Sequence, residues 1–360
     1  MAAFASFRSK ICRNSSFELL RLVLMFLIIV HHAITGLGLY RADTSEMIIQ
    51  HEDLLLFCIV NCFCIPAVNI FVLISGVFAI KPTATKVLSL LVAMLFYTLF
   101  FTLPYLLYTK DFFHALSSLF ILSHSPYWFL IDYLFLMLFA PLLNMMFQYS
   151  NKKYITLFIL GLLFISIYFG FVWGHTANTN GYTLLQFIML YCIGRYIAVY
   201  DIRSPRRNIL IFIYAAASIL CGYGMYVCMG QATHRELARH LTFYNNPLVI
   251  LSSIALFLFF KETHFKSKTV NKLAKSSLSV YLLSCSKFFW ICVFPIIPLF
   301  YRHAKSGFIF LVGVAVFAII TMAISIGIDQ VQIRVNRYFT KYISNKLHLI
   351  EKSADIGSAE

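Results

Sequence analysis

Four ionisable residues interrupt an apolar stretch near the start of the chain, FELLRLVLMFLIIVHHAITG, residues 17 to 36. They are Glu18, Arg21, His31 and His32. Each ionisable side chain at a bilayer centre costs at least about 2.5 to 3.5 kcal/mol on insertion scales, so its presence calls for a compensating role. A guanidinium binds phosphates and carboxylates through two parallel hydrogen bonds, and an imidazole titrates near neutral pH and can accept a proton. These residue types therefore suggest anion binding and proton transfer within a membrane helix.

Helical geometry places three of these residues on one face. Arg21 and His32 are eleven residues apart, which in an α-helix corresponds to about 16 Å of rise and about 20° of rotation. Glu18 precedes Arg21 by three residues and lies on the same face, whereas His31 is turned by about 100° from His32. If the helix runs outward from the cytoplasm, this face carries a carboxylate and a guanidinium in the inner leaflet and an imidazole in the outer half.

Other apolar segments supply groups at the same two depths. We expect Arg195 in the inner third, with Lys81 and Lys86 at the cytoplasmic end of the second span, and Asp132 in the outer third. The inner layer is net positive and suits the phosphates of an anionic cytosolic ligand. The outer layer pairs His32 with a carboxylate that could orient it, which is the arrangement expected of a general base.

Each of these residues also has a purely structural interpretation. Glu18 and Arg21 could neutralise each other so that the helix inserts, and the two histidines could be hydrated residues at the outer interface. The three remaining cations could be topology anchors whose aliphatic stems lie in the membrane while the charge reaches water. Asp132 could border a water-filled vestibule. The sequence alone leaves these alternatives open.

The composition defines the elements that must position these groups. The chain has 360 residues, of which 61% are hydrophobic and only 12% charged, as is typical of a polytopic membrane protein. We predict an all-α integral membrane bundle of about ten transmembrane helices, because runs of about 20 apolar residues recur along the chain. The predicted spans are 17–39, 53–80, 86–108, 126–148, 153–173, 182–200, 208–229, 246–260, 276–299 and 307–333.

The placement of Lys and Arg predicts the orientation of the bundle. With both termini in the cytoplasm, most loop and tail cations fall on the cytoplasmic side, as the positive-inside rule requires. We therefore predict a transmembrane domain over residues 1–334 and a basic cytoplasmic tail over 335–360. The net charge of +15 reflects topology and contact with anionic membrane lipids, and we expect no nucleic-acid partner.

Several enzyme and transporter classes lack their sequence signatures. There is no Walker phosphate loop, no HExxH helix and no GxSxG elbow. Most of the nine cysteines lie within predicted spans, where they pack as small apolar residues, and no His completes a tetrahedral ligand set with them. We therefore expect no metal site, and the basic start of the chain is not expected to be a cleaved signal peptide.

Several motifs together resemble the membrane acyltransferase-3 family. The first is ELLR followed by ten residues and His, in which Glu18 replaces the family's usual Asp and His32, not His31, falls on the family's His. NIFVLISGVFAI (69–80), YWFLIDYLFLMLFAPLLN, NNPLVILSSIALFLFF and SSLSVYLL follow in the family's order. The last two segments are most similar to the branch that O-acetylates bacterial surface sugars.

The resemblance implies transfer of an acetyl or similar short acyl group from cytosolic acetyl-CoA to a hydroxyl of a surface polysaccharide or lipid-linked glycan. The enzyme would be a multi-pass protein of the bacterial cytoplasmic (inner) membrane. Carried over to this chain, Arg21, Lys81 and Lys86 would bind the donor, and His32 would deprotonate the acceptor hydroxyl. The family often has Arg at the two lysine positions, and Ser284 stands where many members have His.

Combined with the two-layer arrangement, these motifs give a predicted site without a metal. Glu18, Arg21, Lys81, Lys86 and Arg195 form the expected acetyl-CoA site. His32 acts as the base, and we hypothesise that Asp132 holds its tautomer. The alternative from a different class is a proton-coupled secondary transporter or glycolipid flippase that uses the same polar face.

Overall fold

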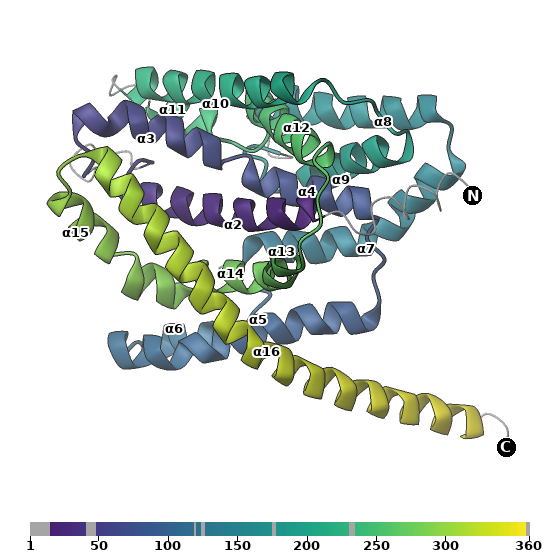
Figure 1. Ribbon diagram of the computed structural model, residues 1–360. Coiled ribbons are helices and arrows are strands. Elements are labelled where there is room, and N and C mark those ends of the chain that lie inside the picture. Colours follow the sequence, from purple (N-terminus) through teal and green to yellow (C-terminus); the bar gives the residue numbers. More distant parts are fainter. Residues whose placement is uncertain are drawn as a thin grey trace.

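The fold is an assembly of helices, shown in the computed structural model of Figure 1. The structure describes residues 15–40, 48–118, 120–123, 127–174, 178–229 and 235–357, and no strand occurs in these ranges. Residues 1–14 of the predicted transmembrane domain and 358–360 of the predicted tail lie outside them. The expected all-α architecture is therefore confirmed for the described part of the chain.

Helix α2 (Ser16–Thr35) carries the polar residues that open the chain and lies in the middle of the bundle, where Figure 1 shows it in purple. It packs against helices that come from most of the sequence. These are α3 (His51–Cys64), α4 (Ala67–Phe78), α12 (Pro247–Lys261), α13 (Lys268–Leu273), α14 (Ser277–Ser284) and α16 (Gly307–Gly357). The polar face of α2 is consequently surrounded by protein, where ionisable groups are less costly than in lipid.

The remaining helices complete the bundle around this centre. Their bounds are α5 (Ala84–Thr109), α6 (Phe112–Ser117), α7 (Trp128–Tyr149), α8 (Lys152–Phe164), α9 (Leu184–Val199), α10 (Arg207–Met229), α11 (Arg235–Leu241) and α15 (Ile296–His303). Helix α8 continues as the π-helical segment η2 (Ile165–Val172), and two short turns, η4 (Ala274–Ser276) and η5 (Phe289–Val293), flank α14. Large apolar side chains on the outward faces of α5, α7, α10 and α16 are exposed, as expected of surfaces that contact lipid.

Seven helical segments in the described ranges are long and apolar enough to cross a membrane. They are Ser16–Thr35, His51–Phe78, Ala84–Thr109, Trp128–Tyr149, Lys152–Val172, Arg207–Met229 and Gly307–Phe339. The pair Lys268–Ser284 and Phe289–His303 is bent by 68° and could count as an eighth, whereas α9 and α12 are apolar but shorter. Each of the ten predicted spans thus contains a helix, but the count of about ten and the cytoplasmic position of both termini stay predictions.

Two glycines allow α4 and α9 to pack closely. A Cβ atom at Gly76 would overlap the backbone carbonyl of Tyr191, and one at Gly194 would overlap the carbonyl of Leu73. Small residues at such positions let two helix backbones approach, which is a common device for packing helices within membranes. The contact fixes α4, and with it the wall that α4 contributes to the centre of the bundle.

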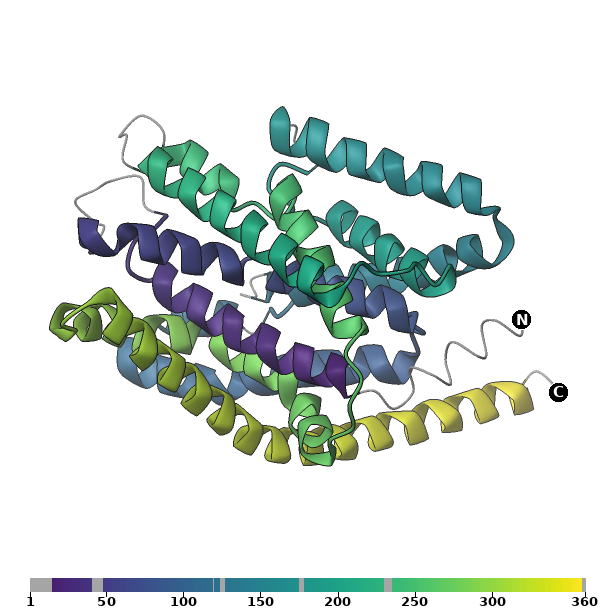
Figure 2. The same cartoon turned by 45° about the horizontal axis from the view of Figure 1, so that its top comes forward.

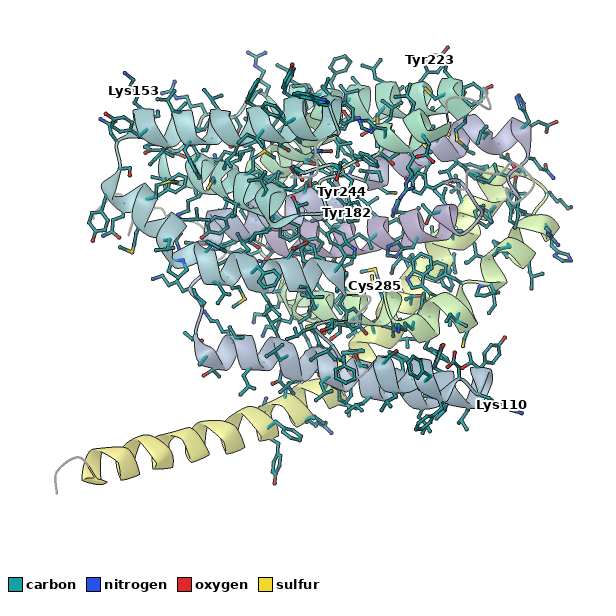
Figure 3. The ribbon with its side chains drawn as sticks, turned by 180° about the vertical axis from the view of Figure 1, so that it is seen from behind. Lys110, Lys153, Tyr182, Tyr223, Tyr244 and Cys285 are labelled. Atoms are coloured by element: carbon teal, nitrogen blue, oxygen red, sulfur yellow. The ribbon has the colours of Figure 1, made fainter. Side chains whose placement is uncertain are left out.

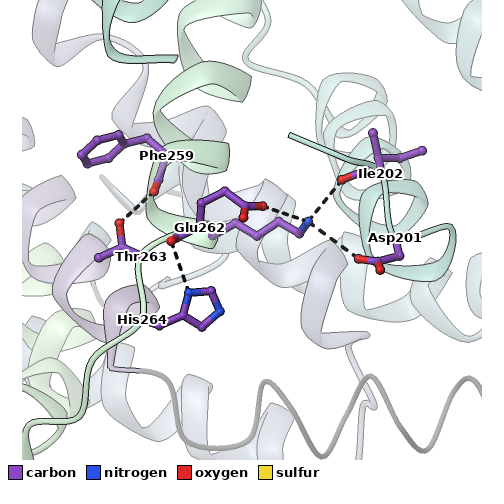
Figure 4. A network of polar contacts seen from close by, with 7 residues as sticks. Asp201, Ile202, Phe259, Glu262, Thr263 and His264 are labelled. Carbon is purple, nitrogen blue, oxygen red and sulfur yellow. Dashed lines mark hydrogen bonds and ion pairs between the residues drawn. The ribbon is translucent and has the colours of Figure 1, made fainter. Parts of the chain in front are cut away.

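Polar contacts join helices that are far apart in the sequence. Asp329 of α16 is buried and accepts hydrogen bonds from Ser276 (2.6 Å) and Ser279, which fastens α16 to the start of α14. At the end of α12, Lys261 donates to the carbonyl of Ile202 (3.3 Å) and lies 3.9 Å from the carboxylate of Asp201 (Figure 4). The predicted tail boundary at residue 334 falls inside α16, whose C-terminal part projects beyond the bundle in Figures 1 and 2.

Candidate functional site

A single cavity of about 740 Å³ runs along the polar face of α2. Its wall comes from α2, α4, α7, α13, η4 and α14, with single residues of α3 and α5 and the connections near residues 182 and 244. Glu18 and Arg21 line one end of it, and His31 and His32 line the other. The volume lies in the range of about 300–1,000 Å³ that is typical of small-molecule sites. The cavity therefore connects the two polar levels that the spacing of Arg21 and His32 predicts.

At the first end, Arg21 forms an ion pair with Glu18. Arg21 Nη1 lies 2.7 Å from Glu18 Oε1, and the two side chains are 30% and 29% exposed. The Arg21 guanidinium also lies 5.7 Å from the centre of the Phe78 ring. Asn271 and Lys275 line the same cavity and add a second cation. This end carries two positive charges and one negative charge, which favours an anionic ligand.

At the second end, His31 is held by a chain of hydrogen bonds. Its Nδ1 lies 2.7 Å from Asn61 Oδ1, and Asn61 Nδ2 donates to the Tyr40 hydroxyl at 2.6 Å. Because Asn61 Oδ1 can only accept, this amide orientation places the proton of a neutral His31 on Nδ1 and the lone pair on Nε2. Burial raises the pKa of Tyr40 well above its ordinary value, so this phenol stays neutral.

His32 is held by aromatic contacts instead of hydrogen bonds. Its ring centre lies 5.0 Å from that of Trp290, 6.2 Å from that of Phe294 and 5.6 Å from that of His31. Its Nδ1 is buried and has no hydrogen-bond partner among the described residues. His32 therefore lines the cavity with both ring nitrogens uncommitted to protein groups in that part of the chain.

The structure does not bring Asp132 to His32. Asp132 lies on α7, one turn after Trp128, and is not part of the cavity wall. No hydrogen bond or ion pair joins it to His32 within the described ranges. Among these residues, His32 therefore lacks the carboxylate partner that the sequence predicts. The neighbouring His31 does have a polar partner, the side-chain amide of Asn61.

The expected cationic layer is also divided by the structure. Lys81 and Lys86 are exposed, outside the cavity wall, and Lys86 Nζ donates to the backbone carbonyl of Lys81 at 2.8 Å. Arg195 is buried where α9 packs on α4, beside the close contact made at Gly76, and does not line the cavity. Of the five residues predicted to bind the donor, Glu18 and Arg21 therefore lie in the cavity.

Several lining residues were not singled out from the sequence. Asn271 of α13 and Lys275 of η4 belong to a stretch that the charge pattern predicts to be a cytoplasmic connection. Trp128, Tyr182 and Tyr244 are aromatic residues of the kind that mostly serve packing in membrane proteins. No pattern in a single sequence indicates that these distant segments meet.

The side chains of the described residues offer no clustered metal ligands. No group of three or more His, Cys, Asp or Glu side chains in this part of the chain could hold a metal ion. The cysteines described there carry free thiols, and most of them are buried.

Comparison with known proteins identifies the family. The family model described as an acyltransferase domain, that of the acyltransferase-3 family, matches residues 14–329 and so covers the whole cavity wall. Neither the curated proteins nor the solved structures compared with the chain gave a match. The matched region includes α3, α4, α12, α13, α14 and the first part of α16, the helices that surround α2. The chain thus belongs to the acyltransferase-3 family and is a multi-pass membrane acyltransferase.

Proposed function

We propose that this protein transfers an acetyl or similar short acyl group from acetyl-CoA to a hydroxyl of a bacterial surface polysaccharide or lipid-linked glycan. The observation that carries the proposal is the continuous cavity, which has Arg21 and Lys275 at one end and two histidines at the other. The protein would act in the cytoplasmic membrane, with the cationic end of the cavity facing the cytosol.

The cationic end suits the donor. The phosphates of acetyl-CoA are anions that Arg21 can bind through parallel hydrogen bonds and that Lys275 can bind as a point charge. The ion pair with Glu18 holds the guanidinium in place before the donor arrives. Beyond it, Met25, Ile28 and Ile74 line the cavity and can contact the flexible arm that carries the thioester.

The histidine end suits the chemical step. The acceptor oxygen attacks the thioester carbonyl carbon, the carbon–sulfur bond breaks, and the thiolate of coenzyme A leaves. We assign the proton of the acceptor hydroxyl to His32, which then returns it to the thiolate, because His32 lies on the same helix face as Arg21 and has no hydrogen bond to lose in the described structure. We do not include Asp132 in this step, because it does not line the cavity.

The test is mass spectrometry of surface glycans from three bacterial strains. One strain lacks the protein, one carries the parent gene and one carries His32→Ala, with equal amounts of protein in the two complemented membranes. We expect an acetyl-sized mass that only the parent restores. Unchanged glycans in the deletion strain would contradict the proposal, and glycan export that needs the proton gradient but no acetyl-CoA would favour the transporter alternative.

A further inference from the structure

Three aromatic side chains from separate segments meet at the histidine end of the cavity. They are Trp128 at the start of α7, Tyr182 just before α9 and Tyr244 just before α12, and all three line the cavity. The ring centres of Tyr182 lie 4.4 Å from Trp128 and 4.6 Å from Tyr244, and Trp128 lies 5.9 Å from Tyr244 with nearly parallel planes. Figure 3 shows Tyr182 and Tyr244 side by side near the middle of the molecule. We call these three residues the aromatic platform.

The platform combines an accessible ring with a fixed backbone. Tyr182 is 43% exposed although it belongs to a cavity wall, so its ring is not simply part of the packed core. Its backbone N–H donates to the side chain of Asn180 at 3.1 Å. The carbonyl of Tyr244 accepts from Asn69 Nδ2 (2.9 Å) and Gln186 Nε2 (3.0 Å). These bonds hold the rings in position without a ligand, which lowers the entropy lost on binding.

The platform lies near His31, whose ring centre is 5.6 Å from that of His32, the residue proposed for the chemical step. The phenol group of Tyr40 is close enough to those of Tyr182 and Tyr244 to interact with them electrostatically. The Tyr40 ring centre is 6.1 Å from that of His31, and its hydroxyl accepts from Asn61. A molecule stacked on the platform would therefore have the imidazole of His31 at its edge, and Asn61 and Tyr40 hold that imidazole from behind the cavity wall. The cations that suit the phosphates of the donor are at the other end of the cavity, so the donor's charged part does not compete for this place.

We propose that the aromatic platform binds a pyranose ring of the acceptor. One face of a pyranose presents several C–H groups, and the negative faces of aromatic rings attract such weakly positive hydrogens. The rim of the same sugar carries hydroxyls, which match the imidazole of His31 in the cavity wall. A simple lipid alcohol would need neither the platform nor this rim. The inference rests on the proposed function, because it names the class of molecule that brings the acceptor hydroxyl.

Binding without the donor tests this inference directly. The chain has three tryptophans, so replacing Trp173 and Trp290 by Phe leaves Trp128 as the fluorophore. The protein, in lipid nanodiscs free of sugar detergents, is titrated with lactose, maltose and chitobiose. Sorbitol, a linear polyol, is the control for hydroxyl groups without a ring face. Tyr182→Ala removes one ring of the platform, and Tyr182→Phe is the matched control that keeps it.

We expect a saturable change in Trp128 fluorescence with at least one of the disaccharides and none with sorbitol. Tyr182→Ala should weaken binding by about 2- to 13-fold, which corresponds to the loss of one aromatic contact, whereas Tyr182→Phe should bind like the parent. The inference is wrong if no disaccharide gives a response, if sorbitol gives the same one, or if both variants bind equally.

The two proposals can fail separately. Transfer of labelled acetyl to a hydroxyl compound that is not a sugar, without disaccharide binding, would refute the platform and keep the acyltransferase step. Disaccharide binding that depends on Tyr182, with no acyl transfer to any hydroxyl compound from acetyl-CoA, would refute the proposed function and keep the platform.

Discussion

Replacing His32 by alanine separates chemistry from stability at this site. The ring contributes aromatic contacts to Trp290 and Phe294, and its Nδ1 has no hydrogen-bond partner in the described structure. The substitution therefore breaks no hydrogen bond in that part of the molecule, and we expect its effect on the free energy of unfolding to be limited to lost packing. If His32 accepts the proton of the acceptor hydroxyl, the transfer rate should fall by about 100- to 10,000-fold, the usual contribution of a general base.

His31→Ala is the matched control, because it removes the neighbouring imidazole from the same cavity. For this variant, the structure predicts a different balance between lost stability and lost transfer rate. The change breaks the 2.7 Å hydrogen bond to Asn61, whose side chain is fully buried, and so leaves an amide oxygen without this partner. Such a loss costs about 1 to 3 kcal/mol. We expect His31→Ala to lower stability more than His32→Ala and to lower the transfer rate less.

The assay measures transfer of radiolabelled acetyl from acetyl-CoA to isolated glycan by protein in lipid nanodiscs, with the thermal unfolding midpoint of each variant. A rate for His32→Ala within about 3-fold of the parent would refute the assignment, since this is far below the contribution of a base. If His31→Ala then lost the activity, the proton acceptor would be the histidine that Asn61 orients. If neither variant lost it, the histidine end of the cavity would not be where the proton is removed.

Three further substitutions test the cavity and its support. Arg21→Ala should raise the KM for acetyl-CoA by about 10- to 100-fold, which corresponds to the loss of a hydrogen bond to a charged group. Lys86 lies outside the cavity, so Lys86→Ala should leave the KM unchanged. Equal KM values for the two variants would contradict donor binding in the cavity. Asp132→Asn should transfer acetyl groups at the parent rate, because Asp132 does not line the cavity, and a large loss measured in the same assay would restore its role as an orienting group. Gly76→Ala should lower the unfolding midpoint, because the added Cβ atom would overlap the carbonyl of Tyr191. Overpacking of this kind typically costs about 1 to 3 kcal/mol of stability. An unchanged midpoint would show that α4 and α9 can separate at no cost.

The predictions that the structure supports are those fixed by one helix. Arg21 and His32 belong to α2, so the helical repeat alone determines that they share a face, and the rise per residue determines their separation. Both residues line one cavity. His31 is turned by about 100° around the helix axis from His32. It still lines the cavity, because the cavity is wider than a single helix face.

The predictions that the structure does not support depended on depth alone. Lys81, Lys86 and Arg195 were placed near Arg21 because they belong to the same leaflet, but depth says nothing about direction around the bundle. Arg195 is buried and does not line the cavity, and the two lysines are on the surface. Lys275 lines the cavity because α13, η4 and α14 pack against α2. That contact joins segments more than 250 residues apart, which the pattern of one sequence does not encode.

The count of spans shows a related limit. Hydropathy identifies apolar segments of sufficient length, but it does not show whether a segment is straight. The predicted span 276–299 falls within the helix pair Lys268–Ser284 and Phe289–His303, which is bent by 68°. Helices α9 and α12 are shorter than a full bilayer crossing, and many of their residues are buried within the protein. Burial of this kind allows an apolar helix to be retained without its facing lipid along its length.

Along α2, the order of charged, apolar and titratable side chains fits the proposed acyl-CoA donor better than a transported proton. Between Arg21 and His31, α2 contributes Met25 and Ile28 to the wall, and neither side chain can carry a proton. A proton path would need titratable groups or water at close intervals over this length. A donor that has a charged end, a long flexible arm and a thioester needs three things from its cavity. They are charged side chains for the phosphates, an apolar passage for the arm and a proton acceptor near the thioester. Along α2 the cavity wall has that order, while Ser75, Tyr133 and Tyr281 add hydroxyl groups from the facing helices. In the proposed step, the proton released by the acceptor therefore has a short route, through His32, to the departing thiolate.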